Sequence, residues 1–191
     1  ITGQDGSYLA NLLINKNYKI FGFTRSKKKK NLVNLEKLSI LDKVSLFEYL
    51  KNDNKFIEKK ILKIKPSQIY ILSGLSSVKK SFSSPIETYR SNIIIPFKIL
   101  EICRKRKLDI KIYNSVSTDC FGNQKSILNE KSNFYPVSPY AKSKSYAFWL
   151  IKYYRETFKV KCVSGIVSNH ESILRNKNFV TKKITEYIKN F

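Results

Sequence analysis

Tyr140 and Lys144 stand four positions apart in the segment VSPYAKSKSYAFW, residues 137–149. On a helix this spacing places both side chains on one face. A neighbouring ammonium favours a phenolate and lowers the pKa of a tyrosine, which would bring Tyr140 closer to acid/base work at physiological pH. Lysine is so common in this chain that the pair alone could equally be two ordinary helical residues. The rest of the sequence has to decide between these two interpretations.

A second polar group follows an apolar run in YNSVSTDCFG, residues 113–122. Ser117, Thr118 and Asp119 would stand at the carboxyl end of a strand, where open α/β sheets hold ligands. Taken alone, these residues fit an Asx turn or a helix cap better. The segment SNHES, residues 168–172, contains His170, the only histidine, and follows another strand candidate. A single histidine is more often structural than catalytic.

The opening segment, ITGQDGSYLANLL, reads as a loop that runs into a helix. Gly3 and Gly6 would supply the last two glycines of a G-x-x-G-x-x-G turn, which brings the backbone close to a pyrophosphate at a helix N-terminus. A plain capping loop is equally compatible with two glycines. Arg25 follows a strand candidate at the place where dinucleotide folds read the adenosine ribose, and arginine there accommodates a 2′-phosphate. Arg25 therefore indicates NADP, although a solvated basic loop also explains it.

The elements that must position these residues alternate between apolar runs and amphipathic stretches, which is typical of βαβ units and a parallel sheet. The predicted strands cover residues 18–24, 44–47, 68–72, 110–115 and 161–167. The predicted helices cover residues 7–16, 54–63, 87–105 and 139–158, and Pro96 should kink or divide the third of them. The expected fold class is α/β, a doubly wound parallel sheet (Rossmann-like). Because no strand precedes the glycine turn, the chain is expected to lack its first, central strand.

Composition limits the remaining possibilities. A chain of 191 residues with 42% hydrophobic residues can build one sizeable core. No apolar run reaches the ~20 residues of a membrane span, and no signal peptide opens the chain. Cysteines are scattered without CxxC spacing, so neither a disulfide framework nor a metal site is expected and a reducing cytoplasm fits best. The three cysteines are Cys103, Cys120 and Cys162.

The formal net charge of +23 raises the question of a polyanionic partner, because clustered lysines release counterions from phosphates. The alternative is a basic, solvated surface without a nucleic-acid function. Lysines are spread along the whole chain, and only residues 27–30 form a block. This distribution favours the solvated surface, and we expect neither a nucleic acid nor a membrane as partner.

Taken in order, these segments resemble the extended short-chain dehydrogenase/reductase superfamily, and within it the GDP-mannose 4,6-dehydratases. The resemblance rests on ITGQDGSYLA, SPYAKSKSYAFW and SGIVSNHES…NFVTKKI, with support from SGLSSVKKSF and YNSVSTDCFG. It covers nearly the whole chain and implies that about half of a complete enzyme is present. It implies an NAD(P)-binding Rossmann-like domain at residues 1–167, without its first strand. Residues 168–191 would begin the substrate-binding part, and the full-length protein would be a homo-oligomer.

The resemblance also assigns roles to individual residues. It implies that GDP-mannose is converted to GDP-4-keto-6-deoxymannose by hydride transfer through bound NADP. The implied catalytic residues are Ser117, Asp119, Tyr140 and Lys144. The implied substrate contacts are Ser117, Asn169 and Glu171. Besides Tyr140 and Lys144, the implied cofactor contacts are Gly3, Gln4, Asp5, Gly6, Arg25, Leu72, Ser73, Gly74, Leu75, Ser76, His170 and Arg175.

The chain departs from the family pattern at three places. Asp119 stands where the family has a glutamate, one methylene longer. Tyr49-Leu50 replaces an Asp-Leu pair near the adenine, and NHESILRN replaces NHESPRRG. These departures bear on activity and substrate rather than on the fold.

Other functions remain open at this stage. An NAD(P)-dependent nucleotide-sugar 4-epimerase or another nucleotide-sugar dehydratase would share the Tyr-x-x-x-Lys pair. A basic nucleic-acid-binding module would explain the charge. It would not explain the ordered set of five segments: the glycine turn, Arg25, residues 117–119, the Tyr140–Lys144 pair and residues 168–172. An inactive fragment is a further alternative, because strands that flank a missing central strand keep unpaired backbone groups.

Overall fold

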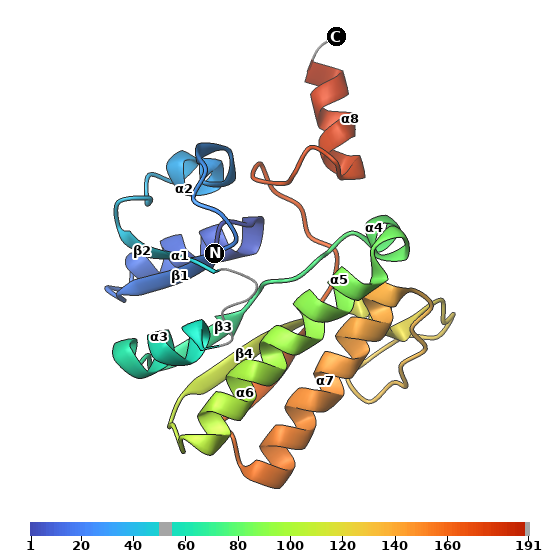
Figure 1. The fold of residues 1–191 in the computed structure, drawn as a ribbon. Helices are drawn as coiled ribbons and strands as arrows, with labels where there is room; N and C mark the ends of the chain where they lie inside the picture. Colours follow the sequence, from blue (N-terminus) through green and yellow to red (C-terminus); the bar gives the residue numbers. More distant parts are fainter. Residues whose placement is uncertain (50–54, 190–191) are drawn as a thin grey trace. The chain divides into compact units, whose positions relative to one another are not determined.

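The computed structural model describes residues 1–49 and 55–189 (Figure 1). The chain divides into two compact units. The first unit comprises Ile1–Phe56 together with His170–Phe191, and the second comprises Ile57–Asn169. In the described ranges, no helix combines the length and apolarity that a membrane crossing requires.

The first unit is built around two parallel strands, β1 and β2, with Ile20 opposite Val44 and Thr24 opposite Glu48. Its core forms where Ala10, Leu35 and Ile40 are buried together. The elements in chain order are α1 (Gln4–Ile14), β1 (Ile20–Thr24), η1 (Lys29–Asn31), α2 (Val33–Lys37), β2 (Val44–Glu48) and α8 (Val180–Lys189).

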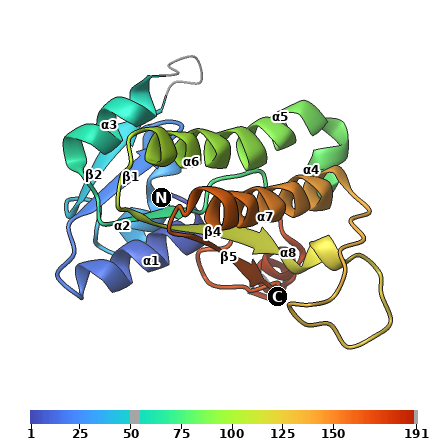
Figure 2. The same ribbon diagram turned by 90° about the horizontal axis from the view of Figure 1, so that it is seen from below.

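The second unit is a parallel sheet of order β3-β4-β5 with helices packed on it. Helices α5 and α6 follow one another end to end and run beside α7, which packs against β4 and β5 (Figures 1 and 2). The elements in chain order are α3 (Phe56–Ile64), β3 (Gln68–Ile71), α4 (Val78–Ser83), α5 (Pro85–Tyr89), the π-helical segment η2 (Arg90–Ile94), α6 (Ile95–Lys105), β4 (Lys111–Ser117), η3 (Thr118–Phe121), α7 (Pro139–Phe158) and β5 (Cys162–Val167).

The two ladders follow the order of a doubly wound sheet. In such a sheet with order 3-2-1-4-5-6, the strands on one side of the first are 2 and 3, and those on the other side are 4, 5 and 6. Within the first unit β1 pairs with β2, and within the second β3, β4 and β5 are consecutive, so the strand order inside each unit is that of a doubly wound sheet. In the part of the chain that the structure describes, no ladder joins β1 to β3.

Helix α7 has both of its ends fixed by local sequence. The side chain of Ser138 accepts a hydrogen bond from the Ala141 amide, and Pro139 occupies the first turn, where a missing N–H costs nothing. Lys159 ends the helix in the left-handed conformation at φ 57°. Its buried residues include Tyr140, Lys144, Ala147, Ile151 and Tyr154, whose spacing of four and three marks one face.

The predicted elements are largely confirmed. All five predicted strands form, and the helix predicted at residues 139–158 has those bounds. The first helix begins at Gln4 rather than Ser7, because Gly3 caps it and the second glycine lies inside its first turn. The third predicted helix is divided just before Pro96, as expected. Residue 54, where another helix was predicted to begin, lies outside the described residues.

Candidate active site

Lys144 lies on the buried face of α7, with only 8% of its surface exposed. Its Nζ donates a hydrogen bond of 2.8 Å to the backbone oxygen of Ser115 in β4. A buried ammonium is costly unless polar groups receive it, so such a position needs a specific partner. Tyr140, one helical turn earlier, is equally buried at 8%. The pair therefore does not consist of two solvated residues on an exposed helix face.

The segment after β4 packs against the start of α7. Ser117 accepts a hydrogen bond from the Asp119 amide at 3.2 Å and so caps the short helix η3. The Cys120 thiol donates to the Ala141 oxygen at 3.6 Å, which brings η3 beside the first turn of α7. The cap uses Ser117 only as an acceptor, and its hydroxyl hydrogen is left for another partner. Ser117 and Asp119 thus lie on a segment that touches the helix of Tyr140.

The loop after β3, residues 72–76, completes this part of the site. Gly74 has a φ of +154°, and a Cβ built on it would lie 3.8 Å from Lys144 Nζ. The loop therefore passes close to the ammonium. Ser73 and Gly74 are exposed, so their outer side is accessible to a ligand. The second unit consequently brings together three of the predicted segments: this loop, the polar end of β4 and the start of α7.

The glycine turn of the first unit has the features of an anion site. Gly3 precedes α1 as its N-cap, and a Cβ on it would meet nothing within 4 Å. A Cβ on Gly6 would lie 2.7 Å from the Ile1 oxygen, so glycine is required for the helix to pack this closely. The first amides of a helix have no partner inside the helix and attract phosphate groups. An open N-terminus beside a small residue fits a pyrophosphate.

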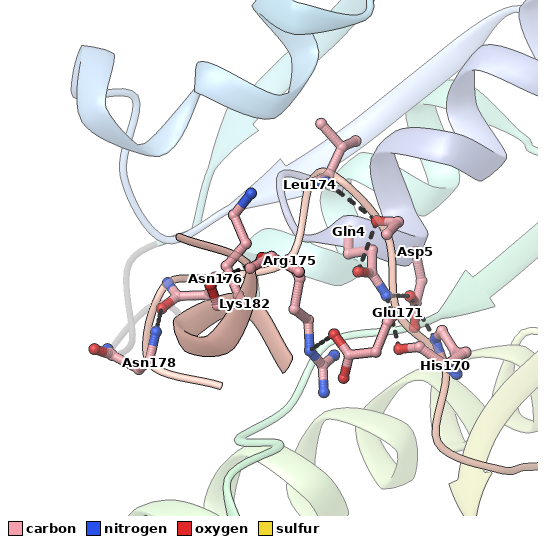
Figure 3. A network of polar contacts seen from close by, with 11 residues as sticks. Gln4, Asp5, His170, Glu171, Leu174, Arg175, Asn176, Asn178 and Lys182 are labelled. Atoms are coloured by element: carbon pink, nitrogen blue, oxygen red, sulfur yellow. Dashed lines mark hydrogen bonds and ion pairs between the residues drawn. The ribbon is translucent and has the colours of Figure 1, made fainter. Parts of the chain in front are cut away.

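The segment after β5 is tied to this same helix N-terminus (Figure 3). His170 Nε2 lies 2.8 Å from Asp5 Oδ1, and Gln4 Nε2 donates to the His170 oxygen at 3.4 Å. The Ser172 hydroxyl donates to Gln4 Oε1 at 2.8 Å. These contacts join positions that are about 165 residues apart in the chain. Two segments that the family resemblance assigned to the cofactor are therefore in contact.

Arg175 lies next to this network. Its Nε is 3.3 Å from Glu171 Oε2 without the geometry of a hydrogen bond, so the two form an ion pair by proximity. Its guanidinium stacks on the Phe179 ring, 3.6 Å from the centroid. Glu171 and Phe179 together hold the guanidinium in place.

Arg25 and Asn169 are both exposed and follow strands. Arg25 comes directly after β1. Two residues later, the backbone amide of Lys27 donates a hydrogen bond to Glu48 Oε2 at 3.3 Å. This contact ties the loop of Arg25 to the end of β2. The departure at Tyr49-Leu50 falls partly outside the described residues, because Leu50 is not among them.

The predicted site residues are divided between the two units. The first unit holds Gly3, Gln4, Asp5, Gly6, Arg25, His170, Glu171 and Arg175, and the second holds Leu72, Ser73, Gly74, Leu75, Ser76, Ser117, Asp119, Tyr140, Lys144 and Asn169. That all of these residues serve one cofactor and one substrate stays a prediction.

Other reactive groups near the site are not arranged for catalysis. Burial raises the pKa of the Cys120 thiol to about 11, so it is protonated and a poor nucleophile at neutral pH. Among the described residues, no three His, Cys, Asp or Glu side chains are grouped as a metal site would need. Sequence reasoning did not find Asn92, Ser115 or Ser143, which hold the loop and the lysine in place.

Comparison with known proteins gives a consistent result. The family described as GDP-mannose 4,6 dehydratase matches residues 1–191. The chain is 36% identical to GDP-mannose 4,6 dehydratase 2 of Caenorhabditis elegans, over 98% of this chain and 52% of that protein. It is 34% identical to the GDP-mannose 4,6 dehydratase of Homo sapiens, over 98% of this chain and 53% of that protein. The chain spans about half the length of the curated relatives it matches.

Solved structures share the fold. A UDP-N-acetylglucosamine 4-epimerase from Methanobrevibacter ruminantium matches with a TM-score of 0.84 and 24% identity, over 98% of this chain and 60% of that one. The dTDP-glucose 4,6-dehydratase of Bacillus anthracis, solved in complex with NAD, matches with a TM-score of 0.80 and 20% identity, over 97% of this chain and 58% of that one. At these identities the likeness establishes a Rossmann-like α/β fold.

Proposed function

The chain belongs to the GDP-mannose 4,6-dehydratase family of the extended short-chain dehydrogenase/reductases, and from this premise we propose that the full-length protein is a nucleotide-sugar 4,6-dehydratase. Its substrate would be GDP-mannose and its product GDP-4-keto-6-deoxymannose. The observation that carries the proposal is the buried Lys144 ammonium, held by the Ser115 oxygen one helical turn from Tyr140. A lysine is seldom buried unless a specific partner receives its charge, and ionisable groups held in this way are frequent at functional sites.

The residues present fit a dinucleotide. The open helix N-terminus at Gly3 and Gly6 suits a pyrophosphate, and the exposed loop 72–76 offers backbone groups beside Lys144. Arg25 favours NADP over NAD, since an arginine after this strand suits a 2′-phosphate. When bound, the nicotinamide supplies the hydride chemistry. The proposed contacts are Gly3, Gln4, Asp5, Gly6, Arg25, Leu72, Ser73, Gly74, Leu75, Ser76, Tyr140, Lys144, His170 and Arg175.

The protein's own groups would act on the sugar as acids and bases. Tyr140, whose phenolate is favoured by the Lys144 charge, takes the proton of the 4-hydroxyl as C4 is oxidised. The Ser117 hydroxyl, whose hydrogen the η3 cap does not use, donates a hydrogen bond to the ketone oxygen that develops at C4. This ketone acidifies the C5–H bond. Asp119 removes the C5 proton and then assists the departure of the C6 hydroxyl as water.

Sugar binding would involve the segment that follows β5. We assign Asn169 and Glu171 to the substrate, and we propose that residues 168–191 begin the substrate-binding part of the full-length protein. The Rossmann-like domain would then end near residue 167. Glu171 Oε2 lies 3.3 Å from Arg175 Nε, and this ion pair holds the Glu171 carboxylate in position. From there the carboxylate would accept a hydrogen bond from a sugar hydroxyl.

An assay with GDP-mannose distinguishes this function from the related ones. Loss of the C6 hydroxyl with formation of a 4-ketone supports a dehydratase, whereas inversion at C4 with the C6 hydroxyl retained would establish an epimerase. Replacing Tyr140 by Phe should abolish C4 oxidation, measured as formation of the 4-ketone, in a variant whose circular dichroism matches that of the wild type. Undiminished turnover in Tyr140→Phe would remove this residue from the mechanism.

We also propose a homo-oligomer in the cytoplasm. Three aromatic side chains on α7, Tyr146, Trp149 and Tyr153, are each more than half exposed and share one face at intervals of three and four residues. Such a stripe suits a second copy of the chain, and light scattering of the full-length protein tests this. The three free, buried cysteines fit a reducing compartment. A nucleic-acid partner would instead appear as binding that weakens steeply with salt.

A further inference from the structure

Residues 170–175, which follow β5 in the chain, belong to the first unit but form neither a helix nor a strand. Helix α8 comes next and has no buried residue, so it does little to hold these residues in place. Leu174 supplies an apolar anchor, because only 4% of its surface is exposed. The polar attachments of the segment are made to the first turn of α1 (Figure 3).

Two side chains at the start of α1, Gln4 and Asp5, make these attachments. The Ser172 hydroxyl donates to Gln4 Oε1 at 2.8 Å, and Gln4 Nε2 donates to the backbone oxygen of His170 at 3.4 Å. Gln4 Nε2 also donates to Asp5 Oδ1 at 3.2 Å, and this same oxygen lies 2.8 Å from His170 Nε2. The Gln4 amide therefore holds the segment at two points, residue 170 and residue 172.

The contacts also engage the acidic side chain of this turn. A carboxylate in the first turn of a helix suits the helix dipole, but it repels a phosphate bound at the same helix end. Asp5 is the acidic residue in the first turn of α1, and its Oδ1 faces both Gln4 and His170. Hydrogen bonds to a carboxylate disperse its charge. Docking of the segment thus makes the start of α1 more favourable for an anion.

On the other side of the contact, the tether fixes the residue proposed to meet the sugar. Glu171 lies between His170 and Ser172, and both of these neighbours are bound to α1. The Ser172 oxygen also accepts from the Leu174 amide at 3.1 Å, so the hydroxyl is held as donor and as acceptor. The position of the Glu171 backbone therefore depends on the link between Ser172 and α1.

We propose that this link couples the two ligands of the enzyme, so that a dinucleotide bound at the start of α1 raises the affinity for the nucleotide sugar. Phosphates that bind the first turn fix the Gln4 amide, and Ser172 passes this order on to Glu171. By linkage, the nucleotide sugar raises the affinity for the dinucleotide by the same factor. Ser172 is thus a positioning residue. The inference rests on the proposed function, because it takes α1 as a cofactor contact and Glu171 as a sugar contact.

Calorimetry of GDP-mannose binding to the full-length protein, with and without saturating NADPH, measures this coupling. NADPH cannot accept a hydride, so the ternary complex does not react. We expect NADPH to tighten GDP-mannose binding at least about fivefold. Ser172→Ala should reduce this factor to below about twofold, whereas Ser172→Thr, which keeps the hydroxyl, should retain it. Ser83→Ala is the matched control, because it removes an exposed hydroxyl that bonds only within its own helix region, to the Lys80 oxygen, and should keep the wild-type factor.

A second measurement on the wild type keeps the proposal testable if Ser172→Ala folds poorly. Amide hydrogen exchange of residues 170–175 should slow at least about threefold when NADPH alone is added. GDP-mannose binding that NADPH does not tighten, an unchanged factor in Ser172→Ala, an equal loss in Ser83→Ala, or exchange that NADPH does not slow would each overturn the proposal. Failure of the wild type to bind NADPH or GDP-mannose would instead overturn the proposed function, and this inference with it.

Discussion

Glu101 holds α6 against α7, the helix of the proposed catalytic pair. Its Oε1 accepts from Arg104 Nε and from the Tyr154 hydroxyl, both at 2.7 Å, and Lys105 Nζ lies 3.2 Å from Oε2. The hydrogen bond from Arg104, followed by that from Tyr154, lowers the pKa of Glu101 from 4.5 to about 2. Burial and the same hydrogen bond raise the pKa of Tyr154 well above its usual value.

The pKa change of Glu101 has a defined effect on stability. Each pKa unit corresponds to about 1.4 kcal/mol, so the full change would be worth about 3 kcal/mol. Arg104 and Lys105 are 34% and 66% exposed, and solvent screening reduces this to about 1–2 kcal/mol. Because the folded-state pKa is depressed, the contribution is complete above pH 4.5 and is lost as the pH falls towards 2. About half of it should be gone near pH ~3.2.

Urea unfolding of the wild type and of Glu101→Gln, at pH 7, 5 and 3.5, measures this contribution. We expect the substitution to lower the free energy of unfolding by about 1–2 kcal/mol at pH 7, with the difference shrinking at pH 3.5. Glu58→Gln is the matched control. Its partner Arg106 is 55% exposed, so a loss below about 1 kcal/mol is expected. A Glu101→Gln difference that is absent at pH 7, or that does not change with pH, would refute this reasoning.

Three further predictions concern the candidate site and its surroundings. Asp119→Glu should keep or raise dehydratase turnover, because it restores the longer side chain and a carboxylate misplaced by about 1 Å can lower the rate ~100-fold. A large loss in steady-state rate would contradict the role assigned to Asp119. Gly74→Ala should destabilise the fold by at least about 1–3 kcal/mol in thermal unfolding, since the φ of +154° and Asn92 both oppose a Cβ; wild-type stability would show that the loop is not held as described. Burial raises the pKa of each cysteine thiol to about 11, so Ellman's reagent at pH 8 should react only after unfolding, and rapid labelling of the folded protein would contradict the burial of Cys103, Cys120 and Cys162.

Much of the fold follows from local sequence. The strands were predictable because a parallel sheet buries continuous apolar runs. Helix α7 was predictable to its ends, since Ser138 and Pro139 start it and a regular amphipathic pattern sustains it. The same pattern placed Tyr140 and Lys144 on one face. It could not show that this face is the buried one, which depends on packing against β4 and β5.

The sequence did not reveal contacts between residues far apart in the chain, nor some of the shorter helices. Asp5 meets His170 across 165 positions, and no local pattern encodes such a pairing. Asn92 was missed because one polar residue in a helical stretch normally faces solvent; its place four residues before Pro96, among isoleucines, was the available signal. Helix α8 was also missed, although Val180, Ile184 and Tyr187 have helical spacing. Helices as short as α2 and α4 offer too few residues for periodicity to act as evidence.

The central claim, that the Tyr140–Lys144 pair serves an internal oxidation and reduction of a nucleotide sugar, is tested most directly by isotope transfer. The full-length protein would be incubated with GDP-mannose deuterated at C4, and the product examined by NMR and mass spectrometry. The account predicts a 4-keto-6-deoxy product that carries the deuterium at C6, with no net consumption of NADP. A product that keeps its C6 hydroxyl, or a deuterium that stays at C4, would contradict it.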